Sequence, residues 1–190
     1  MLDQTHQLVV KQEIHEVVAR YARAIDRMDE ALLRSVFHEG SEHNHFYIGP
    51  SSAPDRPTAG DDPGDFVRFA LALLGGDKRT HHQLGNTLIE LIDADSATAE
   101  TYFTAFHRMR AKDDPLSSPD AYETEMDFFV GGRYLDVFRC VDGVWKIASR
   151  TGMTDWTRLE APCAKSLDGI DQSTLGQRYP ADLIYQLGVS

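Results

Sequence analysis

Residues 131–150 read GGRYLDVFRCVDGVWKIASR and contain the clearest structural pattern of the chain. Asp142-Gly143 separates two runs that are rich in aliphatic and aromatic residues, a combination typical of a tight β-hairpin. We therefore predict strands over Tyr122–Val141 and Val144–Trp156, joined by this turn. The adjacent glycines Gly131-Gly132 predict a bulge in the first strand, and a bulge of this kind curves a sheet.

Further strands are predicted before this hairpin. Polar and aromatic residues alternate over Glu42–Ile48, which indicates a short strand. Thr80–Ile92 and Thr98–Arg110 are predicted as two longer strands that precede the hairpin. Residues 49–64 are rich in proline and glycine, so we expect a long loop there, and loops of this length often act as lids or binding loops.

Three helices are predicted in the first half of the chain. The first one is capped by Asp3 or Thr5 and carries an apolar stripe at helical spacing. That stripe consists of Val10, Ile14, Val17, Val18, Tyr21 and Ile25. The second helix covers Glu30–Phe37, and the third, Asp65–Leu74, is apolar enough that it must cover a core or a partner subunit. Helices followed by long antiparallel strands predict an α+β domain.

Length and charge limit the organisation and the partners. The 190 residues favour one domain, which we place at 1–158, with 159–190 as an extension that packs on the domain or on a neighbouring subunit. The formal net charge of −11 argues against nucleic acid as a partner, because the chain would repel phosphate backbones.

Cysteine content and hydropathy indicate the class of protein. Two cysteines, Cys140 and Cys163, are too few for a disulfide scaffold or a four-cysteine zinc site. The longest strongly apolar run, Phe69–Leu74, is far shorter than a membrane span, so we expect no membrane contact. No basic segment followed by an apolar core begins the chain, and we therefore expect a cytoplasmic location.

Among eight histidines, two stand out by their position on predicted strands. His82 lies within THHQLGN, and His107 lies on the next strand, on a face that is otherwise mostly apolar. An imidazole in such surroundings needs a partner or stays neutral. A single strand histidine is more often structural than functional, so position alone does not assign a role to either.

His43 and His45 alternate on one strand, and such a pair can form half of a metal site. No HExxH motif, cysteine pair or facial-triad spacing accompanies them, so we predict no metal. No GxGxxG or Walker-type glycine loop occurs either, and we predict no cofactor.

Four segments, taken in order, resemble one protein family. They are YARAID at 21–26, HQLGN at 82–86, GGRYLDVF at 131–138 and DGVWKI at 142–147. The pattern is similar to the nuclear transport factor 2-like superfamily, and within it to the SnoaL-like branch, which includes dehydratases and a dehydrochlorinase. The DGVWKI hairpin marks the fold, whereas the aspartate of YARAID and the histidine of HQLGN bear on function.

The resemblance implies a cone-shaped, curved, mixed or antiparallel sheet that is wrapped by three helices around a central cavity. In this branch a helix aspartate pairs with a strand histidine that abstracts a proton, and the matching residues are Asp26 and His82; His81 fits the register less well. The resemblance also implies catalytic roles for His107 and Tyr47. Substrate contacts are expected from Tyr21, His45, Arg150 and Tyr134.

The expected activity is a cofactor-independent lyase, of dehydratase type, on a small cyclic or aromatic substrate. The same pair could instead perform an isomerisation, a cyclisation or a retro-aldol carbon–carbon cleavage. A non-catalytic small-molecule binding domain and the small subunit of a ring dioxygenase share the fold and stay open as alternatives. The chain departs from dehydratases of the branch at Ile25, in the 49–64 loop and in the C-terminal extension, so the substrate stays open too. The related dehydratases are trimers, and we expect a homo-oligomer, with a trimer preferred over a dimer.

Overall fold

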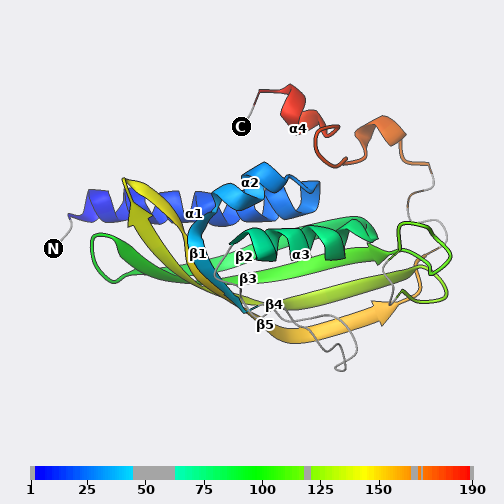
Figure 1. The fold of residues 1–190 in the computed structure, drawn as a ribbon, viewed down its shortest axis with the longest axis horizontal. Coiled ribbons are helices and arrows are strands. Elements are labelled where there is room, and N and C mark those ends of the chain that lie inside the picture. Colours follow the sequence, from blue (N-terminus) through cyan, green and yellow to red (C-terminus); the bar gives the residue numbers. More distant parts are fainter. Residues whose placement is uncertain (1–2, 45–62, 118–120, 164–166, 168, 189–190) are drawn as a thin grey trace.

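The computed structural model describes residues 3–44, 63–117, 121–163, 167 and 169–188. Helices α1, α2 and α3 lie on one side of a curved sheet, and the C-terminal segment runs over the helices (Figure 1). The helices precede the long strands in the chain, which confirms the α+β class predicted from the sequence.

The helical layer consists of α1 (Gln4–Arg27), α2 (Glu30–Ser35) and α3 (Pro63–Gly75). Of the two predicted caps, Asp3 is the one that begins α1, and its carboxylate accepts a hydrogen bond of 2.9 Å from the backbone N–H of His6. The predicted apolar stripe of α1 is buried against the rest of the core. Met28 caps the end of the helix and adopts a left-handed conformation with φ of 56°.

The sheet consists of β1 (Phe37–Asn44), β2 (Asp77–Leu91), β3 (Ser96–Met109), β4 (Met126–Val141) and β5 (Val144–Glu160). The strands lie in the order β1-β5-β4-β3-β2; β1 is parallel to β5, and the other neighbouring pairs are antiparallel. The sheet is therefore mixed, as the resemblance implied. Its edge strands, β1 and β2, do not pair with each other, so the described sheet is open and not a closed barrel.

The first strand differs from its prediction. Phe37, which was predicted as the last residue of the second helix, is the first residue of β1 and pairs with Ile147 of β5. The chain therefore passes from α2 into the sheet almost directly, earlier than the alternation over Glu42–Ile48 indicated. Residues 45–48 and most of the predicted loop at 49–64 lie outside the described residues.

The predicted bulge at Gly131-Gly132 is present, because the pairing of β4 with β5 shifts register between these residues. A Cβ atom at Gly132 would lie 1.9 Å from the carbonyl oxygen of Met153, and one at Gly131 would lie 2.2 Å from the Trp156 ring. Only glycine fits such close approaches. β4 begins later than predicted, at Met126, and β5 continues beyond its predicted end to Glu160.

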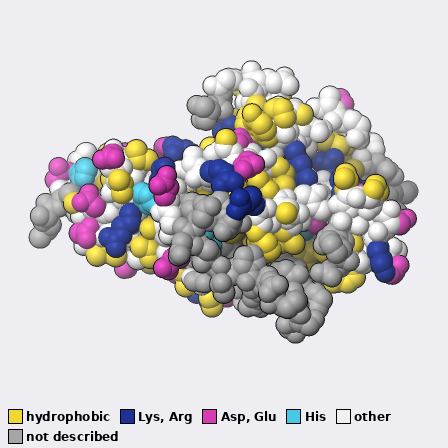
Figure 2. Space-filling view, viewed as in Figure 1, with side chains coloured by type: hydrophobic (Ala, Val, Ile, Leu, Met, Phe, Trp, Pro, Cys, Tyr) yellow, Lys and Arg dark blue, Asp and Glu magenta, His cyan; other side chains and the backbone are white. Residues whose placement is uncertain are grey.

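The C-terminal segment contains the short helices η1 (Gln172–Thr174) and α4 (Leu183–Gln186). It contacts the end of α1: the backbone N–H of Tyr179 donates to the Arg27 carbonyl at 2.6 Å, and Arg27 forms an ion pair with Asp182 at 3.2 Å. Figure 2 shows hydrophobic side chains on the outside of this segment. Among the described helices, none is both long and apolar enough to cross a membrane.

Candidate active site

Asp26 and His82 meet where the end of α1 faces β2. One carboxylate oxygen of Asp26 accepts a hydrogen bond from Nδ1 of His82 at 2.8 Å, and the other accepts one from the His82 backbone N–H, also at 2.8 Å. These two bonds fix the ring and assign the proton to Nδ1, so Nε2 carries the lone pair. The hydrogen bond expected between the two residues is therefore present, whereas His81 is exposed.

Burial and hydrogen bonding act in opposite directions on this pair, whose side chains are only 10% and 8% exposed. Burial raises the pKa of Asp26, but the hydrogen bonds and charge of His82, together with the side chain of Thr80, hold that pKa below its usual value. Burial is the largest single influence on the pKa of His82 and lowers it, the hydrogen bond and charge of Asp26 raise it, and the nearby His107 and His81 lower it, so that the pKa of His82 lies below its usual value. At neutral pH the pair is thus a carboxylate bound to a neutral imidazole, which can accept a proton at Nε2.

A second aspartate–histidine pair lies beside the first. His107 is on β3, and Asp77 is the first residue of β2. Nδ1 of His107 donates to the Asp77 carboxylate at 2.9 Å, and both side chains are largely buried. The rings of His107 and His82 meet edge to face with their centroids 5.5 Å apart. Two imidazoles, each held at Nδ1 by its own carboxylate, therefore lie next to each other.

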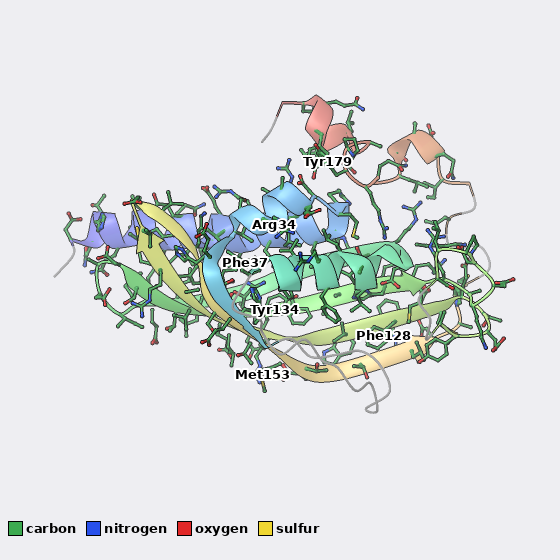
Figure 3. The ribbon with its side chains drawn as sticks, viewed as in Figure 1. Arg34, Phe37, Phe128, Tyr134, Met153 and Tyr179 are labelled. Atoms are coloured by element: carbon green, nitrogen blue, oxygen red, sulfur yellow. The ribbon has the colours of Figure 1, made fainter. Side chains whose placement is uncertain are left out.

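Both histidines line one pocket between the sheet and the helices. The rest of its wall is largely apolar or aromatic and includes Tyr21 and Ile25 from α1, Phe66 and Leu74 from α3, and Phe103 and Tyr134 from the sheet. Tyr134 lies in the layer between β4 and α3 (Figure 3). The pocket volume of about 70 Å³ is several times what one ordered water needs. An apolar pocket with a few convergent polar groups is typical of a site for a small organic molecule.

A fully buried ion pair stands behind two of the wall residues. Arg150 donates from Nε and Nη2 to the two oxygens of Asp136, both at 2.7 Å. The Cζ atom of Arg150 lies 4.1 Å from the ring centroid of Tyr21 and 4.2 Å from that of Tyr134. Burial raises the pKa of both tyrosines, so their hydroxyls stay protonated at neutral pH. Arg150 itself, predicted to contact substrate, does not line the described pocket and instead supports its tyrosines.

The remaining predicted residues of the first strand are only partly described. His43 is buried, stacks on Phe66 with a centroid distance of 4.1 Å, and shares a hydrogen bond of 3.0 Å with Ser41. Burial, together with the charge of Arg150, lowers the pKa of His43 to about 4. His45 and Tyr47 lie outside the described residues. The part of the chain that is described contains no group of three or more His, Cys, Asp or Glu side chains placed to hold a metal ion.

The sequence was compared with models of known protein families. The profile of the SnoaL-like domain matches residues 7–151, well over half of the sequence. The chain belongs to the SnoaL-like family. The assignment made from the four motifs is thereby confirmed, and the match includes both histidines of the pocket while it ends before the C-terminal segment. A search of curated proteins finds no match.

Solved structures share this SnoaL-like fold at low sequence identity. A candidate scytalone dehydratase from Novosphingobium aromaticivorans is 20% identical, with a TM-score of 0.65 over 85% of this chain and 94% of that one. A type 2 hexachlorocyclohexane dehydrochlorinase, LinA, is 15% identical, with a TM-score of 0.67 over 88% and 100%. A candidate aromatic ring hydroxylase from N. aromaticivorans is 20% identical, with a TM-score of 0.61 over 80% and 92%. Such different names on one fold mean that the similarity establishes architecture and not a shared reaction.

Asp77 is the residue of this SnoaL-like site that sequence reasoning missed. The strand was predicted to begin at Thr80, which left Asp77 in the connection after Gly75-Gly76. The apolar face around His107 did indicate that its imidazole needs a polar partner. The partner itself could be found only once the start of β2 was placed beside the end of β3, where Asp77 pairs with Met109.

Proposed function

We propose that this SnoaL-like protein is a cofactor-independent lyase that eliminates a proton and a leaving group from a small cyclic or aromatic substrate, as a dehydratase does. The observation that carries the proposal is the Asp26–His82 hydrogen bond at the wall of a largely apolar pocket. Family membership supports it, since similar structures include proteins named as a dehydratase and a dehydrochlorinase, and both names describe eliminations.

In the proposed reaction, Nε2 of His82 takes a proton from the carbon next to the one that bears the leaving group. The electron pair of the broken C–H bond forms the new double bond, and the bond to the leaving group breaks with its electron pair on that group. Asp26 stabilises the imidazolium that forms on His82. The proton then passes from Nε2 of His82 to Nε2 of the adjacent His107, whose ring Asp77 holds, and His107 gives it to the leaving hydroxyl, so that water departs. Both histidines are thereby neutral again.

The other residues predicted from the resemblance have supporting roles in this proposal. Tyr47 donates to the leaving group or polarises a substrate carbonyl in this proposal, and His45 contacts the substrate. Tyr21 and Tyr134 contact the substrate from the wall that they line, and Arg150 holds their rings. The largely apolar wall of the pocket lowers the local dielectric constant and so strengthens each of these polar contacts.

Turnover tests the proposal. Small cyclic compounds that carry a hydroxyl or chloride beside an acidic C–H bond are incubated with the protein in D₂O and followed by NMR. Loss of water or chloride is the expected result. A moved double bond or a new ring without such loss identifies an isomerase or a cyclase, and carbon–carbon cleavage identifies a retro-aldol lyase. Binding without proton exchange identifies a non-catalytic binding domain, and co-purification with a large iron-bearing protein identifies a dioxygenase subunit.

We also propose that the active form is a homo-oligomer, a trimer in preference to a dimer. Leu135, Met153 and Tyr102 are 39%, 40% and 42% exposed on β4, β5 and β3. Met153 lies on the side of the sheet opposite the helices (Figure 3). Exposed apolar side chains on a sheet suit contact with further copies of the chain. Light scattering is expected to give three times 21.3 kDa, and a mass near 21.3 kDa at micromolar concentration contradicts the proposal.

A further inference from the structure

The second aspartate–histidine pair lies where the C-terminal segment meets the domain. Asp77 follows α3 closely, and Arg178 of the C-terminal segment binds the backbone at this corner. Nη2 of Arg178 donates to the carbonyl oxygen of Asp77 at 2.7 Å and to that of Leu74 at 3.0 Å. Nη1 lies 3.5 Å from the carbonyl oxygen of Gly75. One guanidinium group therefore joins the end of α3 to the start of β2.

There is a physical reason for an arginine at this corner. The last carbonyl groups of a helix have no partner within the helix and carry a partial negative charge, which a cation stabilises. Leu74 lines the pocket and Asp77 binds His107, so the corner carries two parts of the site. Burial lowers the pKa of Arg178, the charge of Asp77 raises it, and the nearby Arg110 lowers it. Arg178 thus lies within electrostatic range of the Asp77 carboxylate as well as bonding its backbone.

Arg178 is itself held in place by contacts on both sides in the chain. The next residue, Tyr179, donates its backbone N–H to the Arg27 carbonyl, and Gln177 donates its own to Asp182 at 2.8 Å. Asp182 in turn forms the ion pair with Arg27. Arg27 directly follows Asp26, so the segment is attached close to the first aspartate and reaches across to the second one.

We propose that Asp77 and Arg178 are positioning residues for His107, and that the C-terminal segment thereby completes the active site. Asp77 holds the ring through Nδ1, and Arg178 holds the corner that presents Asp77. The catalytic use of His107 rests on the proposed function, whereas its positioning does not. Arg178 lies outside residues 7–151, so this support comes from a part of the chain beyond the family match.

Nitrogen-15 NMR of the imidazole groups tests the proposal without any substrate. The full-length protein, labelled at histidine, is compared with the Asp77→Ala, Arg178→Ala and Arg178→Lys variants; a His107→Gln variant assigns the resonances. We expect His107 of the unmodified protein to carry its proton on Nδ1. Asp77→Ala removes the acceptor, so the proton should move to Nε2. If that variant does not fold, Asp77→Asn keeps the shape of the side chain and is expected to give both tautomers.

Arg178→Ala should keep the tautomer but speed solvent exchange of the His107 Nδ1–H by about tenfold or more, the effect of losing a charge-assisted hydrogen bond. Arg178→Lys should recover part of the protection. Arg79→Ala is the matched control, because Arg79 also donates to the segment, at the Gly176 carbonyl at 3.3 Å, but its contact lies outside this corner. Unchanged exchange in Arg178→Ala, or an equal increase in Arg79→Ala, would overturn the proposal. Because no turnover is measured, a failure of the lyase proposal leaves this result interpretable.

Discussion

The two aspartate–histidine pairs have nearly the same short-range geometry but very different supports. The Nδ1-to-carboxylate distances are 2.8 Å for His82 and 2.9 Å for His107. Asp26 stands on a 24-residue helix with a buried apolar stripe, and its second oxygen also binds the His82 backbone. Asp77 stands at a corner between a helix and a strand, and the corner is bonded by an arginine from the C-terminal segment.

This difference separates what the family fold provides from what this chain adds. The first pair depends on α1 and β2, and both Asp26 and His82 lie within residues 7–151. The second pair depends in addition on Arg178, which lies beyond that match. Because the second pair depends on a segment outside the family match, a change in that segment can alter the position of His107 without altering the Asp26–His82 pair. We therefore expect the first pair to determine whether proton abstraction occurs and the second to affect which leaving group is accepted.

The largest expected effect comes from breaking the first pair. His82→Ala should lower kcat of the true substrate by about 10²–10⁴-fold or more, the usual contribution of a positioned general base. Asp26→Asn should have a loss of similar order, because an amide can impose the wrong tautomer and cannot stabilise the imidazolium. Steady-state kinetics, with circular dichroism as a check on folding, measures both.

His81→Ala is the matched control for this pair, since His81 neighbours His82 on the same strand but is exposed. It should retain nearly full activity. If His81→Ala is as damaging as His82→Ala, or if Asp26→Asn is harmless, the assignment of the base to His82 is wrong.

A smaller effect is expected from the second pair. Asp77→Asn should reduce kcat by about 10²-fold, near the lower end for a proton-transfer group, because the histidine itself remains in place. Substrates with a better leaving group should lose less, since they depend less on proton donation. Comparing a hydroxyl with a halide leaving group on one ring system measures this. An equal loss for both would show that Asp77 does not act through His107 as an acid.

The pH dependence of kcat/KM is expected to report on the protonation of the first pair. His82 acts as a base only when it is neutral, so activity should fall as the pH drops through its pKa. Burial lowers that pKa from about 6.5, so the midpoint of the acid limb of kcat/KM should lie below pH 6.5. Asp26 raises the pKa of His82, so Asp26→Asn should move the midpoint to still lower pH while it reduces the plateau. A midpoint that moves upward in this variant would contradict the assignment.

Much of the fold could be predicted from local patterns, because those patterns report directly on burial and turns. The stripe from Val10 to Ile25 is the buried face of α1, and Asp142-Gly143 connects β4 and β5. The bulge at Gly131-Gly132 followed from glycine alone. β1 was misplaced because Phe37 is equally compatible with the end of a helix and the start of a buried strand. Its parallel pairing with β5 decides between them, and that is a long-range contact.

Site residues could be predicted where a short sequence motif marks them, and could not where their position depends on long-range contacts. Asp26 and His82 were identified by motifs that belong to single elements, and their hydrogen bond is present. Asp77 and Arg178 have no motif, because their positions depend on where β2 begins and on contacts between residues about a hundred positions apart. Arg150 shows the same limit: the family resemblance implied a substrate contact, but full burial against Asp136 places it behind the pocket wall.

Metal removal is expected to have the smallest effect. The experiment distinguishes two roles for the histidines of both pairs, acid–base groups and metal ligands. Nδ1 of His82 and Nδ1 of His107 each donate to an aspartate carboxylate. To bind a metal beside the histidines, either carboxylate would have to give up this hydrogen bond. No third ligand accompanies them among the described residues. Dialysis against EDTA should therefore leave the rate unchanged, and elemental analysis should find well below one metal per chain. Stoichiometric zinc or iron, with activity lost on its removal and restored on its return, would contradict this prediction. The imidazoles would then be metal ligands, and the carboxylates would orient them as ligands, not as proton acceptors.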